Sequence, residues 1–197
     1  LLRSRSSQPR LSEYPALLPH LLKRSSSTFC SATATLGAPA DSYFEYLVKS
    51  WVQGGRSEQH TWEQFADVMD AVCGIATYTS RNGHVITRSV TASLQGPVTF
   101  NHEMDHLSCY IPGMILLGLD GLPKSDVRRR TAWVTLAENL TETCFKMYSK
   151  SPHGICGETI RLNDQDEWSM AGEYHLRPEA VEAFFYMYRH TGEEKYR

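Results

Sequence analysis

Ionisable side chains gather where a helix near the end of the chain is expected to begin. His175 and Arg177 precede Pro178, and Glu179 follows it. Glu182 lies three residues after Glu179, so the two carboxylates would share one face of a helix. An acidic cluster with Arg and His fits a site for sugar hydroxyls or for a hydrated divalent cation. A surface salt-bridge network is the other interpretation, and the spacing leaves it open.

A second carboxylate, Asp41, stands at the start of another expected helix, as Glu179 does after Pro178. Free backbone N–H groups and the helix dipole stabilise anions at such positions. We therefore expect a lowered pKa and an ionised carboxylate, which suits a base that activates water. Acidic residues are also preferred at these positions merely as caps, and that is the alternative for Asp41.

The run from His102 to His106 matches the HExxH zinc pattern, with Glu103 as the general base. On a helix the two histidines would share one face and bind zinc. The context argues against this, because residues 98–101 give no helical run and Pro112 follows closely. No third ligand stands at a familiar short spacing. A zinc peptidase is therefore a distant alternative.

Apolar residues at helical spacing predict four main helices, over residues 42–52, 61–78, 125–148 and from 178 onward. Ser42 and Glu45 have the spacing of a capping box. Residues 79–103 are rich in Gly, Ser and Thr and predict a long loop with room for a short strand. Pro112 is expected to kink a helix or to start a new one. The predicted fold class is all-α.

Composition limits the classes of protein. The chain has 197 residues, 41% of them hydrophobic, which is enough for a packed core. Lys+Arg is 20 and Asp+Glu is 22, so a chain-wide basic surface for nucleic acid is not expected. The apolar runs are far shorter than the roughly 18 residues that a membrane span needs. Five cysteines without a CxxC pair argue against a zinc ribbon.

Both ends of the sequence suggest a piece of a larger domain. The first residues, LLRSRSSQPR, contain no apolar region of a signal peptide. The last expected helix has no following helix to cover its apolar face. We expect residues 1–12 to be unstructured or unrelated, and any membrane anchor to lie upstream.

Several segments resemble, in order, blocks of glycoside hydrolase family 47, the class I α-1,2-mannosidases of the secretory pathway. They are YPALLP, LGAPADSYFEYLVKSWVQGG, MDHLSCYIPGMILLG, LAENLTETCFKMY with GICGETI, and YHLRPEAVEAFFYMYRHTGEEKYR. The resemblance covers about residues 13–197 and implies part of a catalytic domain. The implied fold is part of an (α/α)7 barrel of helical hairpins.

The resemblance implies an inverting, Ca2+-dependent hydrolysis of terminal α-1,2-linked mannose from high-mannose N-glycans of glycoproteins. Asp41 and Glu179 match active-site carboxylates of the family. The positions expected to bind sugar, or water held by calcium, are Arg177, His106, Glu182 and Glu158, with calcium waters reached through Glu179 and Glu182. Cys109 and Cys144 match the family's disulfide pair. The implied location is the lumen of the endoplasmic reticulum or Golgi.

Three departures from the family pattern leave other functions open. The family's general acid, a Glu in an upstream block, and its calcium-ligating Thr, in a C-terminal block, have no counterpart here. Cys156 and Gly157 replace a Ser-Pro pair before Glu158. An inactive truncated product is one alternative. A lectin-like relative that binds mannose glycans for glycoprotein degradation is another, although such relatives tend to lack the cysteine pair.

Overall fold

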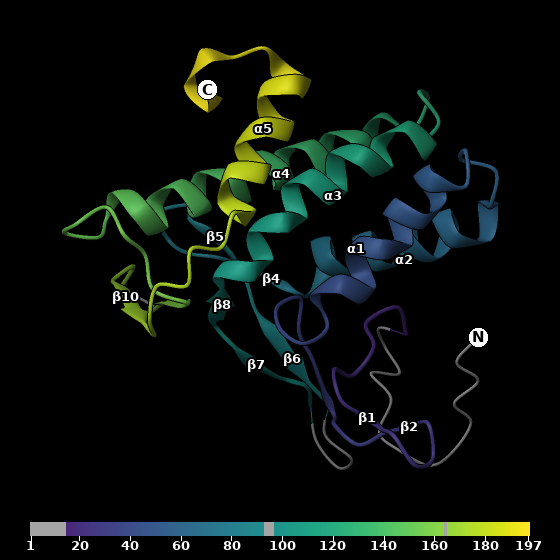
Figure 1. The fold of residues 1–197 in the computed structure, drawn as a ribbon, viewed down its shortest axis with the longest axis horizontal. Coiled ribbons are helices and arrows are strands. Elements are labelled where there is room, and N and C mark those ends of the chain that lie inside the picture. Colours follow the sequence, from purple (N-terminus) through teal and green to yellow (C-terminus); the bar gives the residue numbers. More distant parts are fainter. Residues whose placement is uncertain (1–14, 93–96, 164) are drawn as a thin grey trace.

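The computed structural model describes residues 15–92, 97–163 and 165–197, and the expectation for residues 1–12 lies outside them. Helices make up most of the regular structure (Figure 1), and this confirms the predicted helical class. The α-helices are α1 (Asp41–Gln53), α2 (Gln59–Gly74), α3 (Ile111–Gly118), α4 (Val127–Ser149) and α5 (Glu179–Thr191). Three 3-10 turns accompany them, η1 (His106–Tyr110), η2 (Leu119–Gly121) and η3 (Glu194–Tyr196).

Short antiparallel strands join the helices, and most of them were not expected from the sequence. They form four small sheets, with the strand orders β1-β2, β3-β6-β7, β4-β5 and β10-β9-β8. The strands are β1 (Leu22–Lys23), β2 (Thr28–Phe29), β3 (Thr33–Ala34), β4 (Thr77–Thr79), β5 (Val85–Thr87), β6 (Ser89–Thr91), β7 (Thr99–Asn101), β8 (Glu103–Asp105), β9 (Thr159–Leu162) and β10 (Trp168–Ala171). The expected loop over 79–103 is therefore wrong in part, because short strands occupy much of it.

Helix α1 forms for the expected reason, since its apolar residues recur at helical spacing and are buried. Phe44, Val48 and Trp51 face the core, and Gly54 ends the helix. The capping box is not formed: the N-cap is Ala40, and no side chain caps the helix. The reason is that the helix begins one residue early, at Asp41, so that Ser42 already lies inside its first turn.

Helix α2 is shorter than predicted, because the chain leaves the helix at Gly74 and enters β4 at Thr77. Thr77 and Thr79 are β-branched and pair with β5, where such residues pack well. Pro112 stands in the first turn of α3, so it starts a new helix after η1. Helix α4 begins where Asp126 accepts a hydrogen bond from the Arg129 backbone N–H.

The buried apolar side chains form two clusters. The larger one joins α1, α2, α3 and the first half of α4, around Phe44, Phe65 and Trp133. The smaller one lies between η1, the end of α4 and the β8-β9 sheet, around Met104, Met147 and Ile160. Among the described residues, no helix is both long and apolar enough to cross a membrane.

Candidate active site

Three helical elements start close to one another, and each carries an ionisable residue at its first position. Asp41 opens α1, His106 opens η1 and Glu179 opens α5. The β8-β9 pairing brings a further pair of acidic residues to the same place. Asp105 is opposite Thr159, and the His106 backbone N–H donates to the Glu158 carbonyl over 2.8 Å. Residues from four separate segments therefore meet at the start of these helices.

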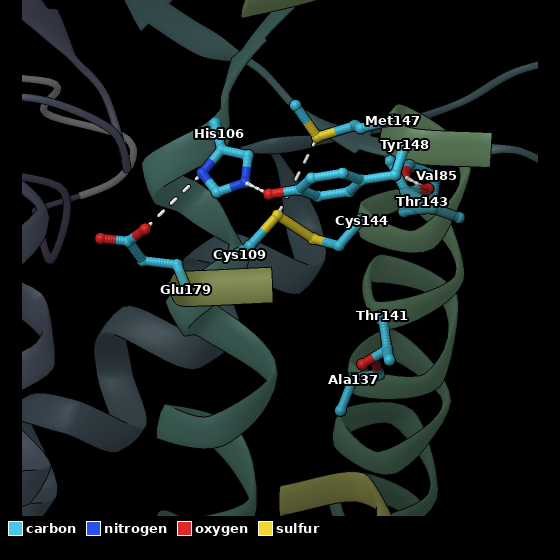
Figure 2. The surroundings of a disulfide bond; sticks show 10 residues. All are labelled: Val85, His106, Cys109, Ala137, Thr141, Thr143, Cys144, Met147, Tyr148 and Glu179. Carbon is cyan, nitrogen blue, oxygen red and sulfur yellow. Dashed lines mark hydrogen bonds and ion pairs between the residues drawn. A yellow bond between two sulfur atoms is a disulfide. The ribbon is translucent and has the colours of Figure 1, made fainter. Parts of the chain in front are cut away.

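His106 and Glu179 face each other at the centre of this site (Figure 2). The distance from His106 Nδ1 to Glu179 Oε2 is 3.6 Å, and the two side chains are 3% and 21% exposed. Neither atom has a hydrogen-bond partner within the described part of the chain. On its other side, His106 Nε2 lies 2.7 Å from the Tyr148 hydroxyl. The imidazole is thus held between a carboxylate and a phenol.

Burial governs the protonation of both groups. It lowers the pKa of His106, which favours the neutral imidazole. It raises the pKa of Glu179, and the opposing effects of a backbone hydrogen bond and of the Arg177 charge are smaller. The expectation that the helix start lowers the pKa of this carboxyl is therefore wrong in its net direction, because desolvation outweighs the helix terminus.

Arg177 forms an ion pair with Glu158 next to this centre. Its Nε donates to Glu158 Oε2 over 2.6 Å, and this bond raises the pKa of the guanidinium. Arg177 belongs to the chain that enters α5, and Glu158 belongs to the chain that enters β9. The pair joins two of the predicted site residues and places one positive charge among several carboxylates.

Glu182 belongs to a second group of charged side chains, which links α5 to α1. Lys49 Nζ lies 3.7 Å from Glu182 Oε1 and also pairs with Glu45. Burial raises the pKa of Glu182, and the Lys49 charge opposes the shift. Sequence reasoning assigned Glu45 to a cap and missed Lys49. Their i, i+4 spacing was the available signal.

Asp41 lies within electrostatic reach of Asp105 and Tyr110. Burial raises the pKa of Asp105, and the negative charge of Asp41 adds to that shift. Asp105 Oδ2 accepts a hydrogen bond from the Ala38 backbone N–H over 3.1 Å. A Cβ atom at Gly37 would lie 1.9 Å from the same oxygen, so only glycine leaves room there. Tyr110 is buried, and its hydroxyl has no hydrogen-bond partner within the described residues.

The zinc interpretation of the HExxH run is wrong, because residues 103–105 form a strand rather than a helix. An extended chain rises about 3.3 Å per residue, so residues four apart are roughly 13 Å apart and cannot bind one zinc ion together. Glu103 pairs with Arg161, and His102 stacks on Tyr78 with ring centroids 4.0 Å apart. Within residues 15–92, 97–163 and 165–197, no group of three or more His, Cys, Asp or Glu is placed to hold a metal ion.

The same result limits what these residues offer to calcium. Ca2+ takes six to eight oxygen ligands, and Glu179 and Glu182 supply carboxylate oxygens of the right kind. They do not form a cation site by themselves. Further ligands would have to come from water or from other segments.

The disulfide between Cys109 and Cys144 is present, as the resemblance implied. It spans 35 residues and ties η1 to α4 beside the His106–Tyr148 contact (Figure 2). Cys30, Cys73 and Cys156 are free. Cys156 is buried and hydrogen-bonds to Tyr148.

This arrangement suits the removal of a proton from a small polar molecule. A half-buried carboxylate whose Oε2 has no hydrogen-bond partner among the described residues, and whose pKa is raised, is a competent general base. The surrounding carboxylates and Arg177 offer acceptors and donors that fit a sugar.

Comparison with known proteins gives a consistent result. The sequence model of Glycosyl hydrolase family 47 matches residues 3–197. The chain is 36% identical over 190 residues to the endoplasmic reticulum mannosyl-oligosaccharide 1,2-alpha-mannosidase of Homo sapiens, covering 91% of this chain and 26% of that protein. It is 33% identical over 177 residues to the mannosyl-oligosaccharide 1,2-alpha-mannosidase mans-2 of Caenorhabditis elegans, covering 86% of this chain and 28% of that protein.

A solved structure supports the fold. The alpha-1,2-mannosidase from Trichoderma reesei superposes with a TM-score of 0.81 at 18% identity, over 99% of this chain and 42% of that one. The fold is therefore part of an (α/α)7 barrel, as the resemblance implied. The chain spans about a quarter of the length of the curated relatives that it matches.

Proposed function

Because this chain belongs to glycosyl hydrolase family 47, we propose that it forms part of an inverting α-1,2-mannosidase. The reaction is hydrolysis of a terminal α-1,2-linked mannose, and the substrates are high-mannose N-glycans of glycoproteins. The names of the relatives in Homo sapiens and Caenorhabditis elegans support the substrate class.

Glu179 is the proposed general base. The observation that carries this role is its half-buried carboxylate, which faces His106 and has one oxygen without a hydrogen-bond partner among the residues that the structure describes. Such an oxygen is available to a water molecule. Its raised pKa strengthens it as a proton acceptor at the pH of the lumen. In an inverting glycosidase the base and the acid lie roughly 6.5–9.5 Å apart, with the water between base and sugar. We assign the acid to a segment of the full-length gene product outside these residues.

The other site residues are proposed to hold the sugar. Asp41 lies within electrostatic reach of half-buried Asp105 and is proposed as a second active-site carboxylate. Arg177 and Glu158 offer a guanidinium and a carboxylate to sugar hydroxyls, and their ion pair fixes both. His106 orients the Glu179 carboxylate, and Glu182 adds a second carboxylate three residues further along α5.

Calcium dependence is part of the proposal, with a restricted role for this chain. The carboxylates of Glu179 and Glu182 would contact waters of a bound Ca2+, and ligands from elsewhere would complete its shell. We derive no chemical step through the ion. The proposed location is the lumen of the secretory pathway, which fits both the disulfide and the name of the human relative.

The test is release of mannose from a high-mannose glycan by the full-length gene product, with calcium and with a chelator. Calcium-dependent release of mannose with inverted anomeric configuration is the expected result. A lectin-like relative would bind the glycan and release nothing. Glycan binding measured beside mannose release separates this alternative from an inactive product, which would do neither.

A further inference from the structure

Tyr148 contacts the proposed catalytic pair from outside the sugar site. It lies in the last turn of α4, and its hydroxyl is 2.7 Å from His106 Nε2 (Figure 2). The opposite ring nitrogen, Nδ1, is the atom that faces Glu179. Whether Tyr148 donates to Nε2 or accepts from it therefore decides whether Nδ1 presents an N–H or a lone pair to the Glu179 carboxylate.

We propose that Tyr148 is a positioning residue, whose hydroxyl donates to His106 Nε2 and so turns an N–H at Nδ1 toward Glu179. The inference rests on the proposed function, in which Glu179 is the general base. Tyr148 itself touches neither sugar nor water in this scheme and acts only through His106.

The argument starts from the neutral imidazole, which has one donor nitrogen and one acceptor nitrogen. If Nε2 carried the hydrogen, the bare lone pair of Nδ1 would face the carboxylate across 3.6 Å. With Glu179 ionised, as a general base must be, two acceptors would then oppose each other in a buried place, where unsatisfied polar atoms are costly. With the hydrogen on Nδ1, the same contact becomes attractive. The tautomer that carries hydrogen on Nδ1 needs a donor at Nε2, and Tyr148 is the group at that position.

The Tyr148 hydroxyl is able to act as this donor. Burial raises its pKa, so the phenol keeps its proton at neutral pH. The phenol then donates to Nε2 over 2.7 Å, and Nδ1 donates toward Glu179.

The backbone fixes the same two elements by a second link. Cys109 follows His106 by three residues on η1, and residues three apart lie on one side of a 3-10 helix. Cys144 precedes Tyr148 by four residues on α4, and residues four apart share a helical face. The disulfide and the His106–Tyr148 hydrogen bond are therefore two links between one pair of elements, as Figure 2 shows.

The first test measures the wild-type protein, and a variant serves only to assign its signals. Full-length gene product with 15N-labelled histidine is examined by NMR at neutral pH, and the His106 signals are assigned by their loss in His106→Gln. We expect an unprotonated Nε2 and a protonated Nδ1. A proton on Nε2 would overturn the inference, whether or not the protein releases mannose.

The second test is Tyr148→Phe, which keeps the ring and removes one oxygen. We expect kcat for mannose release to fall about 10- to 100-fold with KM little changed, since small misplacements of a catalytic group cost this much. The His106 signals should shift toward a mixture of tautomers. Tyr188→Phe, at the far end of α5 from Glu179, is the control and should keep wild-type kcat.

Unchanged His106 signals and unchanged kcat in Tyr148→Phe would overturn the inference. A fall in kcat with unchanged His106 signals would overturn it too, because the loss would then have a merely structural cause. A wild-type protein that releases no mannose overturns the proposed function instead. The tautomer of His106 is still read in that case, so the two failures are distinguishable.

Discussion

Burial sets the protonation of the two groups at the centre of the site in a complementary way. It favours the neutral form of His106 and also the neutral form of Glu179. The pair therefore gains little from a full ion pair, despite the 3.6 Å contact. The contact with His106 therefore mainly orients the Glu179 carboxylate, which the fold keeps partly away from water.

Glu179→Gln tests this balance through stability as well as activity. We expect kcat for mannose release to fall by about 10²–10⁴, the usual loss for a general base. The folded pKa of Glu179 lies above its unfolded value, so the folded state holds the proton more tightly. The wild-type free energy of unfolding must then fall as pH rises through the interval between those pKa values. The variant escapes this loss and should be more stable than wild type at neutral pH.

The gain in stability of Glu179→Gln over wild type should shrink as pH falls below the unfolded pKa of Glu179, since the wild-type carboxyl is then protonated in both the folded and the unfolded state. Denaturant unfolding at several pH values between 4 and 8 measures it. Glu194→Gln, which replaces an exposed carboxylate near the end of the chain, is the control and should follow wild type. An active Glu179→Gln would remove this residue from the role of base.

Arg177→Gln gives a pH prediction with a definite sign. The Arg177 charge lowers the pKa of Glu179, so its loss should raise that pKa further. Because the base must be ionised, the acid limb of the kcat profile should move to higher pH. Arg161→Gln, which also removes an ion-paired arginine but faces Glu103, is the matched control. Equal profiles for Arg177→Gln and wild type would contradict the coupling.

Helix starts separate what local sequence determines from what three-dimensional packing determines. The sequence pattern places a cap at Ser42, but the structure begins α1 at Asp41 without any side-chain cap. At α4 the cap is Asp126, whose carboxylate accepts from the Arg129 backbone N–H over 3.1 Å. Two superficially similar helix starts therefore differ in how much a polar side chain stabilises them.

Asp126→Ala and Ser42→Ala test this difference. We expect Asp126→Ala to reduce the free energy of unfolding by about 1 kcal/mol, the typical loss for an N-cap. Ser42→Ala should change it by less than about 0.5 kcal/mol, because the exposed Ser42 side chain caps nothing. Denaturant unfolding of both variants gives the comparison. A larger loss of unfolding free energy in Ser42→Ala would instead support a capping box at Ser42.

The helices were predictable and the strands were not, for a physical reason. Helical periodicity repeats over many residues, as in α1 and α4, whereas the strands are two to four residues long. Such runs are too short to show alternation, and their partners are distant. Glu103 pairs with Arg161, 58 residues away. Only the folded chain reveals that pairing.

Motifs that resemble the family predicted the candidate site residues, whereas contacts that cross the fold could not be predicted. Asp41, His106 and Glu179 were predicted from such motifs, and the structure places them at the first positions of α1, η1 and α5. Tyr148 was not, since it lies 42 residues from His106 and belongs to an ordinary helical pattern. The net pKa direction of Glu179 also needed structure, because desolvation depends on what surrounds the carboxyl.

At the scale of the whole molecule, the disulfide connects the site to the core. Cys109 and Cys144 belong to the smaller buried cluster with Met104 and Met147, and two of its members, Met104 and Cys109, flank His106 in the chain. The larger cluster holds α1, α2 and α3 together without covalent help. The position of η1 against α4 therefore depends on this small cluster, on the disulfide and on the His106–Tyr148 hydrogen bond.

Removal of that bond, by Cys109→Ser with Cys144→Ser, should destabilise the protein and reduce its activity. Closure of a 35-residue loop corresponds to roughly 3–4 kcal/mol of chain entropy in the unfolded state. Since domains have only about 5–15 kcal/mol of net stability, this loss should lower the denaturant midpoint markedly. Reductant should shift the wild-type midpoint toward that of the double variant and leave the midpoint of the variant unchanged.

Cys30→Ser, at an exposed free cysteine, is the control and should unfold like wild type. Equal midpoints of wild type with and without reductant would show that packing alone holds η1 against α4.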